Sequence, residues 1–328
     1  MNPEDPLSQE DPLEALLEQA RGNEPFSGAS LQAASALEGE PLRRFAATWR
    51  QLSPDRRLEL LDQFYIALQE NYALDGEGLC LLAFDDADGE VRERAFTLAG
   101  EDESLQLYEP LLRAAEQEPD REARMAAIEA LGTFMLLAQA DDWPRQRWEP
   151  AQTVLLEQIR RSRLDPVMRG AALLSLSYLA TPEAEHEIRL AYADPSLREA
   201  AIEGMGRSCE DVWIPELQAE MQSDDDSIRL LAVLAAAEME DEAFVPELVA
   251  RTQDPDEEIR LAAIGALGLI GGEEAENILT QLEHSMDPDI REAAVLARRE
   301  AHSLDEVLDP GFGVLDEDED PADGLEPR

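Results

Sequence analysis

One short phrase recurs along the chain and constrains its fold more than any other feature. Its clearest copy covers residues 254–268, where Asp254 and Pro255 precede Ile259, Arg260 and an alanine-rich stretch. The arginine of the phrase recurs at intervals of 32, 45, 29, 31, 31 and 31 residues, at Arg92, Arg124, Arg169, Arg198, Arg229, Arg260 and Arg291. A nearly fixed period in this range predicts an array of stacked structural repeats.

Each copy of the phrase predicts a helix with one apolar face. Asp suits the cap of a helix and Pro suits its first position. Positions −1, +3, +4 and +7 from the arginine share one helical face. Position +3 is alanine in every copy: Ala95, Ala127, Ala172, Ala201, Ala232, Ala263 and Ala294. Such a column indicates that neighbouring helices approach closely, and a shorter amphipathic segment after each one predicts an array of helix pairs.

These residues resemble the HEAT-repeat family in its short bacterial form, as in the repeats of phycobilin lyases. The resemblance rests on the Asp-Pro turn, the Ile/Val/Leu-Arg pair, the alanine column and the closing Leu131-Gly132, Met205-Gly206 and Leu267-Gly268. It implies an all-α fold, a right-handed superhelix or HEAT-like solenoid. It implies little about function, because one fold supports many unrelated tasks.

The composition predicts that the two terminal segments of the chain differ in structure from the repeat array between them. Both ends are rich in acidic residues, and the helix-prone patches Leu13–Ala20 and Leu31–Leu37 interrupt the first of them. We expect a disordered acidic N-terminal tail over 1–40, a helical cap or degenerate repeat over 41–78, seven HEAT-like repeats over 79–303, and a disordered acidic tail over 304–328.

The charge of the chain limits its partners. It has 27 basic and 74 acidic residues, for a net charge of −47. Such a field repels nucleic acid and anionic membranes, and it favours a basic or amphipathic protein partner. An acidic solvated surface without a specific partner would explain the same composition.

The cysteines and the apolar segments of the sequence predict the cellular compartment. Cys80 and Cys209 lie several repeats apart, so we expect both to be buried and reduced. The chain begins without an apolar leader and has no long apolar run, which favours a cytoplasmic protein.

No pattern of catalytic, cofactor-binding or metal-binding residues emerges. The resemblance extends to deoxyhypusine hydroxylase, a di-iron enzyme whose ligands are His-Glu pairs just after the repeat arginine. No histidine follows any of these arginines here, and the pair His186-Glu187 lies outside the phrase. We therefore expect a non-enzymatic interaction or assembly scaffold. The alternative that the resemblance implies is a chromophore-handling enzyme similar to the phycobilin lyases.

The variable positions +1 and +5 predict where a partner binds. Leu230, Leu234 and Leu261 occupy them in adjacent copies, and Glu199, Glu203 and Glu258 border these leucines. Together they predict a site on the concave face for an amphipathic, basic segment. The alternative is that the leucines pack sideways against neighbouring helices of the array.

A second candidate site lies in the long interval between Arg124 and Arg169. Trp143 and Trp148 occur close together there, in an expected loop at 141–150 before an expected helix at 151–163. Arg145, Arg147, Arg160, Arg161 and Arg163 make this stretch locally basic. Tryptophan and arginine are typical anchors of protein interfaces, which suggests a docking loop. The alternative is that the tryptophans pack over a break in the stack.

Overall fold

The computed structural model describes residues 11–35, 37–70, 74–141, 143–162 and 164–308. These residues form α-helices and two short 3-10 helices, with no β-strand among them. The all-α solenoid class expected from the sequence is confirmed. The chain divides into two compact units, residues 1–209 (unit 1) and residues 210–328 (unit 2).

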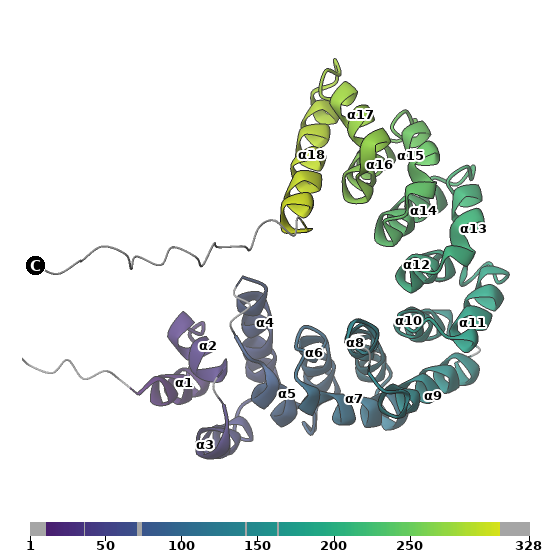
Figure 1. Cartoon of the computed structure of the whole chain (residues 1–328). Coiled ribbons are helices and arrows are strands. Elements are labelled where there is room, and N and C mark those ends of the chain that lie inside the picture. Colours follow the sequence, from purple (N-terminus) through teal and green to yellow (C-terminus); the bar gives the residue numbers. More distant parts are fainter. Residues whose placement is uncertain (1–10, 36, 71–73, 142, 163, 309–328) are drawn as a thin grey trace, which may run out of the picture. The chain divides into compact units, whose positions relative to one another are not determined.

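The described residues of unit 1 form twelve helices, labelled in Figure 1. They are α1 (Pro12–Arg21), α2 (Gly28–Ser35), α3 (Gly39–Trp49), α4 (Pro54–Glu70), α5 (Glu77–Ala83), α6 (Gly89–Ala99), α7 (Leu105–Gln117), α8 (Arg121–Ala140), α9 (Arg145–Arg161), α10 (Pro166–Ser177), α11 (Pro182–Tyr192) and α12 (Arg198–Ser208).

Unit 2 contains six α-helices. They are α13 (Ile214–Glu220), α14 (Asp226–Met239), α15 (Val245–Arg251), α16 (Glu257–Ile270), α17 (Gly272–Leu282) and α18 (Pro288–Leu308). Short 3-10 helices at Asp211–Trp213 and Glu242–Phe244 lead into α13 and α15.

The helices with the repeat arginines form an inner row in each unit. In unit 1, α6, α8, α10 and α12 pack in sequence against one another, and in unit 2, α14, α16 and α18 do so. The other helix of each pair lies along the outer side of this row, away from its free face (Figure 1). Apolar stripes of both helices are thereby buried between neighbouring pairs.

The alanine column lies at the contacts within the inner rows. All seven of its alanines are fully buried. The helices approach so closely that a β-carbon added at Gly268 would lie 2.7 Å from the β-carbon of Ala297 in the next helix. Small residues at these positions therefore set the separation of the repeats.

The prediction of a disordered tail over 1–40 is wrong for residues 11–35. Helices α1 and α2 pack against each other, and Leu16, Leu17 and Phe26 are buried. This segment is rich in acidic residues, but it also has enough apolar side chains to form a small core. Residues 1–10 lie outside the described residues.

Arg56 of α4 binds this N-terminal segment. Its side chain is 7 % exposed and donates to the carbonyl oxygens of Gln19 (2.7 Å) and Glu24 (2.6 Å). Its guanidinium also lies 4.0 Å from the centroid of the Phe26 ring. One buried cation therefore connects α4 with the turn after α1.

Two further predicted boundaries are corrected. The expected loop at 141–150 is largely helical, because α9 begins at Arg145 and contains Pro150. The long interval between Arg124 and Arg169 is taken up by α8 and α9, which have 20 and 17 residues. At the C-terminal end, α18 continues to Leu308, beyond the predicted boundary at 303, and residues 309–328 lie outside the described residues.

Replacing Arg56 tests how the N-terminal helices are attached. Arg56→Met keeps an unbranched side chain but removes the hydrogen-bond donors, at about 1–3 kcal/mol for each buried partner left unsatisfied. We expect faster amide hydrogen exchange in residues 12–35, measured by mass spectrometry. Arg43→Met, at a side chain that is 72 % exposed, is the control. Equal exchange in the two variants would contradict this role of Arg56.

Candidate interaction surface

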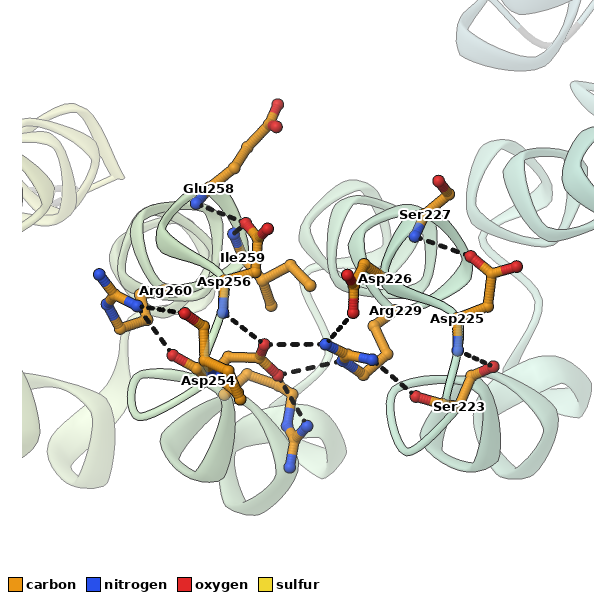
Figure 2. A network of polar contacts seen from close by, with 12 residues as sticks. Ser223, Asp225, Asp226, Ser227, Arg229, Asp254, Asp256, Glu258, Ile259 and Arg260 are labelled. Carbon is orange, nitrogen blue, oxygen red and sulfur yellow. Dashed lines mark hydrogen bonds and ion pairs between the residues drawn. The ribbon is translucent and has the colours of Figure 1, made fainter.

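A buried ion pair connects consecutive repeats of unit 2. Arg229 of α14 donates to both carboxylate oxygens of Asp254, over 3.1 Å and 3.0 Å, as Figure 2 shows. The two side chains are 9 % and 0 % exposed. Arg251 donates to the same carboxylate over 2.9 Å. Asp254 thus joins the inner helix of one repeat to the loop that begins the next.

The same loop residue also organises the start of α16. Its carboxylate accepts from the backbone N–H of Asp256 (3.1 Å), and its carbonyl oxygen accepts from Arg260 (2.9 Å) (Figure 2). Asp256 in turn caps α16 by accepting from the N–H groups of Glu258 and Ile259. The prediction that Asp254 caps this helix is therefore wrong: the cap is two residues later, and Asp254 is the partner of Arg229.

Unit 1 repeats this arrangement. Arg57 binds Asp86 (2.8 Å and 2.9 Å), and Arg92 binds Glu118 through two hydrogen bonds (2.9 Å and 2.7 Å). In each case the acid lies six residues before the arginine of the next repeat. We call these pairs, together with Arg229–Asp254, the arginine rungs. Carboxylates bound in this bidentate manner are held in one orientation.

Two of the rung carboxylates, Asp254 and Glu118, are stabilised in their charged form. Burial alone would raise the pKa of Asp254, but the hydrogen bonds from Arg229 and the N–H of Asp256 outweigh it, and the pKa is lowered. The pKa of Glu118 is lowered in the same way, with Arg92 opposing the effect of burial. Because the paired donors and carboxylates bind each other within the fold, the rungs stabilise the array and are poor candidates for a binding site.

The free face of the inner row of unit 2 differs from its buried face. Leu234, Leu269 and Leu296 are 45 %, 39 % and 50 % exposed. Leu230 and Leu261 are half-buried. We call this set the leucine face: Leu230, Leu234, Leu261, Leu269 and Leu296, from α14, α16 and α18. The prediction had included only Leu230, Leu234 and Leu261, although the spacing of the repeats also places Leu296 at position +5.

The middle of the leucine face is open. Gly265 lies between Leu261 and Leu269 along α16, and a β-carbon added there would meet no atom within 4 Å. Glu258 is exposed in the first turn of α16, and Glu292 is exposed near the start of α18. Exposed apolar residues edged by carboxylates are typical of a surface that receives a basic amphipathic segment.

The other predicted acidic residues belong to unit 1. Glu199 is exposed on α12, and Glu203 lies 3.9 Å from Arg207 on the same helix. The sequence analysis combined them with the leucines because it treated the repeats as one uninterrupted array. Within unit 2, Glu258 is the member of the predicted set that accompanies the leucines.

The inner row of unit 1 carries carboxylates that the sequence analysis overlooked. Glu93 of α6 and Glu129 of α8 occupy the variable positions +1 and +5. Desolvation raises the pKa of both groups, and the charge of Glu93 raises that of Glu129 further. The free faces of the two units therefore differ in chemistry: acidic at Glu93 and Glu129 and apolar at the leucine face.

The two tryptophans of the predicted docking loop have structural contacts. Trp143 is 8 % exposed and meets the ring of Tyr108 edge-on at 5.8 Å. The guanidinium of Arg147 lies 3.8 Å from the Trp143 ring, and Tyr108 donates to the carbonyl oxygen of Arg147 over 2.8 Å. Burial raises the pKa of Tyr108 to about 12.

Trp143 therefore packs within unit 1 and offers little surface to a partner. Trp148, half-buried on α9, has Arg145 5.9 Å from its ring. Trp143 thus agrees with the alternative stated above, in which the tryptophans pack within the fold and do not bind a partner.

Other reactive groups are scattered. Cys80 is buried as expected, and burial raises the pKa of its thiol. Cys209 is exposed, contrary to prediction; it follows α12 in a left-handed conformation with φ of 49°. Within the described ranges, no group of three or more His, Cys, Asp or Glu side chains could hold a metal ion.

Comparison with known families agrees with this repeat geometry. A family model of HEAT repeats matches residues 76–177 and 214–299, more than half of the chain. The chain belongs to the HEAT-repeat family. The resemblance drawn from the recurring phrase is thereby confirmed. A search of curated protein sequences found no match.

Several solved structures resemble this HEAT-repeat chain in fold. The complex of CpcE and CpcF of phycocyanin lyase from Nostoc sp. PCC7120 is 22% identical, with a TM-score of 0.46 over 69% of this chain and 93% of that chain. Human deoxyhypusine hydroxylase in complex with glycerol is 14% identical, with a TM-score of 0.33 over 89% and 100%. Importin beta is 16% identical, with a TM-score of 0.38 over 91% and 48%. Similarity at this level concerns the fold and indicates no activity.

No helix in the described part of the HEAT-repeat chain has the length and apolar character needed to cross a membrane.

Replacing Asp254 tests the contribution of a rung to the stability of the HEAT repeats. Asp254→Asn leaves Arg229 and Arg251 without their shared carboxylate, at about 3–5 kcal/mol, the usual effect of removing one partner of a buried pair. Urea unfolding followed by circular dichroism measures the loss. Asp224→Asn, at an exposed side chain without an ion pair among the described residues, should change stability by about 0.5 kcal/mol or less. Similar losses in both variants would contradict the role of the rung.

Acid should remove the stabilisation that the Asp254 charge provides. Since the folded state lowers its pKa below the ordinary value of 3.8, the contribution is complete above that pH and is lost as the pH falls through the folded-state pKa. The difference in unfolding free energy between wild type and Asp254→Asn should therefore be constant near neutral pH and decrease in acid. A difference that increases with acidification would show that the direction of the pKa shift is wrong.

Proposed function

We propose that this HEAT-repeat protein is a non-enzymatic interaction scaffold whose leucine face binds a basic amphipathic helix of a protein partner. The observation that carries the proposal is the exposure of Leu234, Leu269 and Leu296 on the free side of the inner row of unit 2. The residues that stack the repeats are buried, so they are not available to a partner. The leucine face remains accessible through Leu234, Leu269 and Leu296.

The shape and chemistry of the leucine face support a helix as the occupant. The leucines follow three neighbouring helices, and the open position at Gly265 leaves room for an apolar side chain between Leu261 and Leu269. A partner helix with apolar residues three and four positions apart would cover such a surface with one face. Burying one leucine fully is worth about 1.5–3 kcal/mol, so a few of them account for useful affinity.

Charge supports a basic partner. Glu258 and Glu292 are exposed at the edge of the leucine face, and the whole chain carries −47. Such a field accelerates the approach of a cationic partner to the leucine face. Leucines would then determine the lifetime of the complex, while the carboxylates would determine its rate of formation and its salt dependence. A cytoplasmic location remains part of this proposal.

The alternative from the sequence analysis, in which the leucines pack sideways within the array, accounts for part of the set. Leu230 and Leu261 are half-buried and contribute to such packing. Leu234 and Leu296 keep 45 % and 50 % of their surface in water, and sideways packing leaves that area unexplained.

The test is binding of a synthetic amphipathic helix made of leucine and lysine. We expect the double variant Leu234→Ser/Leu296→Ser to bind the peptide at least about tenfold more weakly than wild type. About half of each leucine side chain is exposed, and the variant removes the apolar surface that the peptide would bury there. Dissociation constants come from fluorescence anisotropy of the labelled peptide, at low and high salt. Raising the salt should weaken both complexes and preserve their ratio.

The matched control is Leu105→Ser/Leu190→Ser. These leucines are 49 % and 52 % exposed on the outer helices α7 and α11. The control variant should bind like wild type. Equal affinities for wild type and the leucine-face variant would refute the proposal, and so would an equal loss in the control.

A further inference from the structure

A pocket of about 460 Å³ lies where the regular repeat is interrupted in unit 1. Arg124 of α8, Gln158 and Arg161 of α9, and Ser162 and Leu164 of the following turn contribute to its lining. Arg161 belongs to the locally basic stretch noted in the sequence. The function proposed for the leucine face does not involve this stretch, and the pocket lies beside it.

Arg124 has no carboxylate at the sequence position that supplies the acid in the three arginine rungs, and Arg260 is similar, because that position is Ser285. The acid of a rung lies six residues before the next repeat arginine, as Asp86 does before Arg92 and Asp254 before Arg260. For Arg124 that sequence position is Arg163, which lies outside the described residues. Arg124 donates to the carbonyl oxygen of Glu118 over 2.8 Å, and no ion pair to it occurs in the part of the chain that the structure describes. It lines the pocket together with Arg161.

The neighbouring acids do not replace the missing partner. Asp165 is bound through both oxygens by Arg121 (2.7 Å and 3.0 Å), and it caps α10 through the N–H of Met168 (3.1 Å). Its pKa is lowered, chiefly by the hydrogen bonds from Arg121. Glu116 is exposed and accepts a hydrogen bond from Gln117. Arg161 brings a second positive charge, although it also pairs with Glu157 over 2.6 Å.

We propose that this pocket binds a carboxylate side chain of an acidic peptide, with Arg124 as its principal partner. The bound carboxylate would take the position that an internal acid takes in the complete rungs. A guanidinium matches a carboxylate through two parallel hydrogen bonds, which gives orientation as well as affinity. Leu164, which is 99 % exposed, would cover apolar atoms beside that carboxylate. The site lies within unit 1 and is independent of the function proposed for the leucine face.

The experiment uses a peptide copied from a complete rung. The probe is the acetylated and amidated segment of residues 252–256, Thr-Gln-Asp-Pro-Asp, whose first aspartate is the rung acid of unit 2. The matched peptide has asparagine in place of that aspartate. Binding to the full chain is followed by NMR of its ¹⁵N-labelled arginine side chains. We expect the aspartate peptide to bind at least about fivefold more tightly than the asparagine peptide, with the largest shift at Arg124.

Three variants decide the site. Arg124→Gln should weaken binding at least about tenfold, because it removes the charged partner. Glu116→Gln should strengthen binding by about threefold, because it removes an exposed like charge at the pocket. Arg160→Gln is the control: it removes the same charge from an exposed position of α9 outside the pocket, and it should change affinity by less than about twofold.

Several outcomes would overturn the proposal: no binding of the aspartate peptide, equal binding of the two peptides, or equal effects of Arg124→Gln and Arg160→Gln. Circular dichroism checks that each variant is folded. If Arg124→Gln loses helicity, the peptide pair and the Glu116→Gln variant still decide, since Glu116 is exposed and supports no other part of the fold. In that case, absence of the Glu116→Gln gain would overturn the proposal.

Discussion

The ion pair between the arginine of one repeat and an acid of the following loop is the interaction on which the array depends. Stacked helix pairs could slide or rotate against each other if only apolar contacts joined them. A bidentate pair such as Arg229–Asp254 is directional, and it is almost completely buried. Its acid also accepts from the N–H of Asp256, so the same residue fixes the loop and the relation between repeats. Buried ion pairs often contribute specificity more than net stability, and this geometry suits that role.

The rungs and the alanine column also determine which residues are free to act. Both sets are used within the fold, so a partner meets the variable positions of the inner helices. At these positions unit 1 presents Glu93 and Glu129, and unit 2 presents leucines such as Leu234. The same fold therefore displays two surfaces of different chemistry. The irregular repeat adds a third, since Arg124, which has no ion pair among the described residues, lines a pocket.

Much of this architecture follows from the period of the sequence. Alternation of helices, burial of the alanines and the role of the arginines as scaffold were all predictable, because each repeat supplies an independent copy of the same signal. Loop geometry was less predictable. Asp254 and Asp256 are both acids near a proline, and only the structure shows which one caps the helix and which one binds Arg229.

Contacts between distant residues account for the remaining errors. Trp143 is buried against Tyr108, which lies on another helix, and no local pattern connects the two. Likewise, residues 11–35 are ordered through Arg56, a contact that composition cannot reveal. The grouping of Glu199 and Glu203 with the leucines stays a prediction, because these acids belong to unit 1 and the leucines to unit 2.

A double-mutant cycle on Arg229 and Asp254 tests the central claim most directly. Unfolding free energies are measured in urea for wild type, Arg229→Met, Asp254→Asn and the variant with both changes. If the rung couples two repeats, the double variant should be hardly less stable than the weaker single variant, with a coupling energy of at least about 2 kcal/mol. Additive effects, to within about 0.5 kcal/mol, would show that the two residues act separately and would contradict the account.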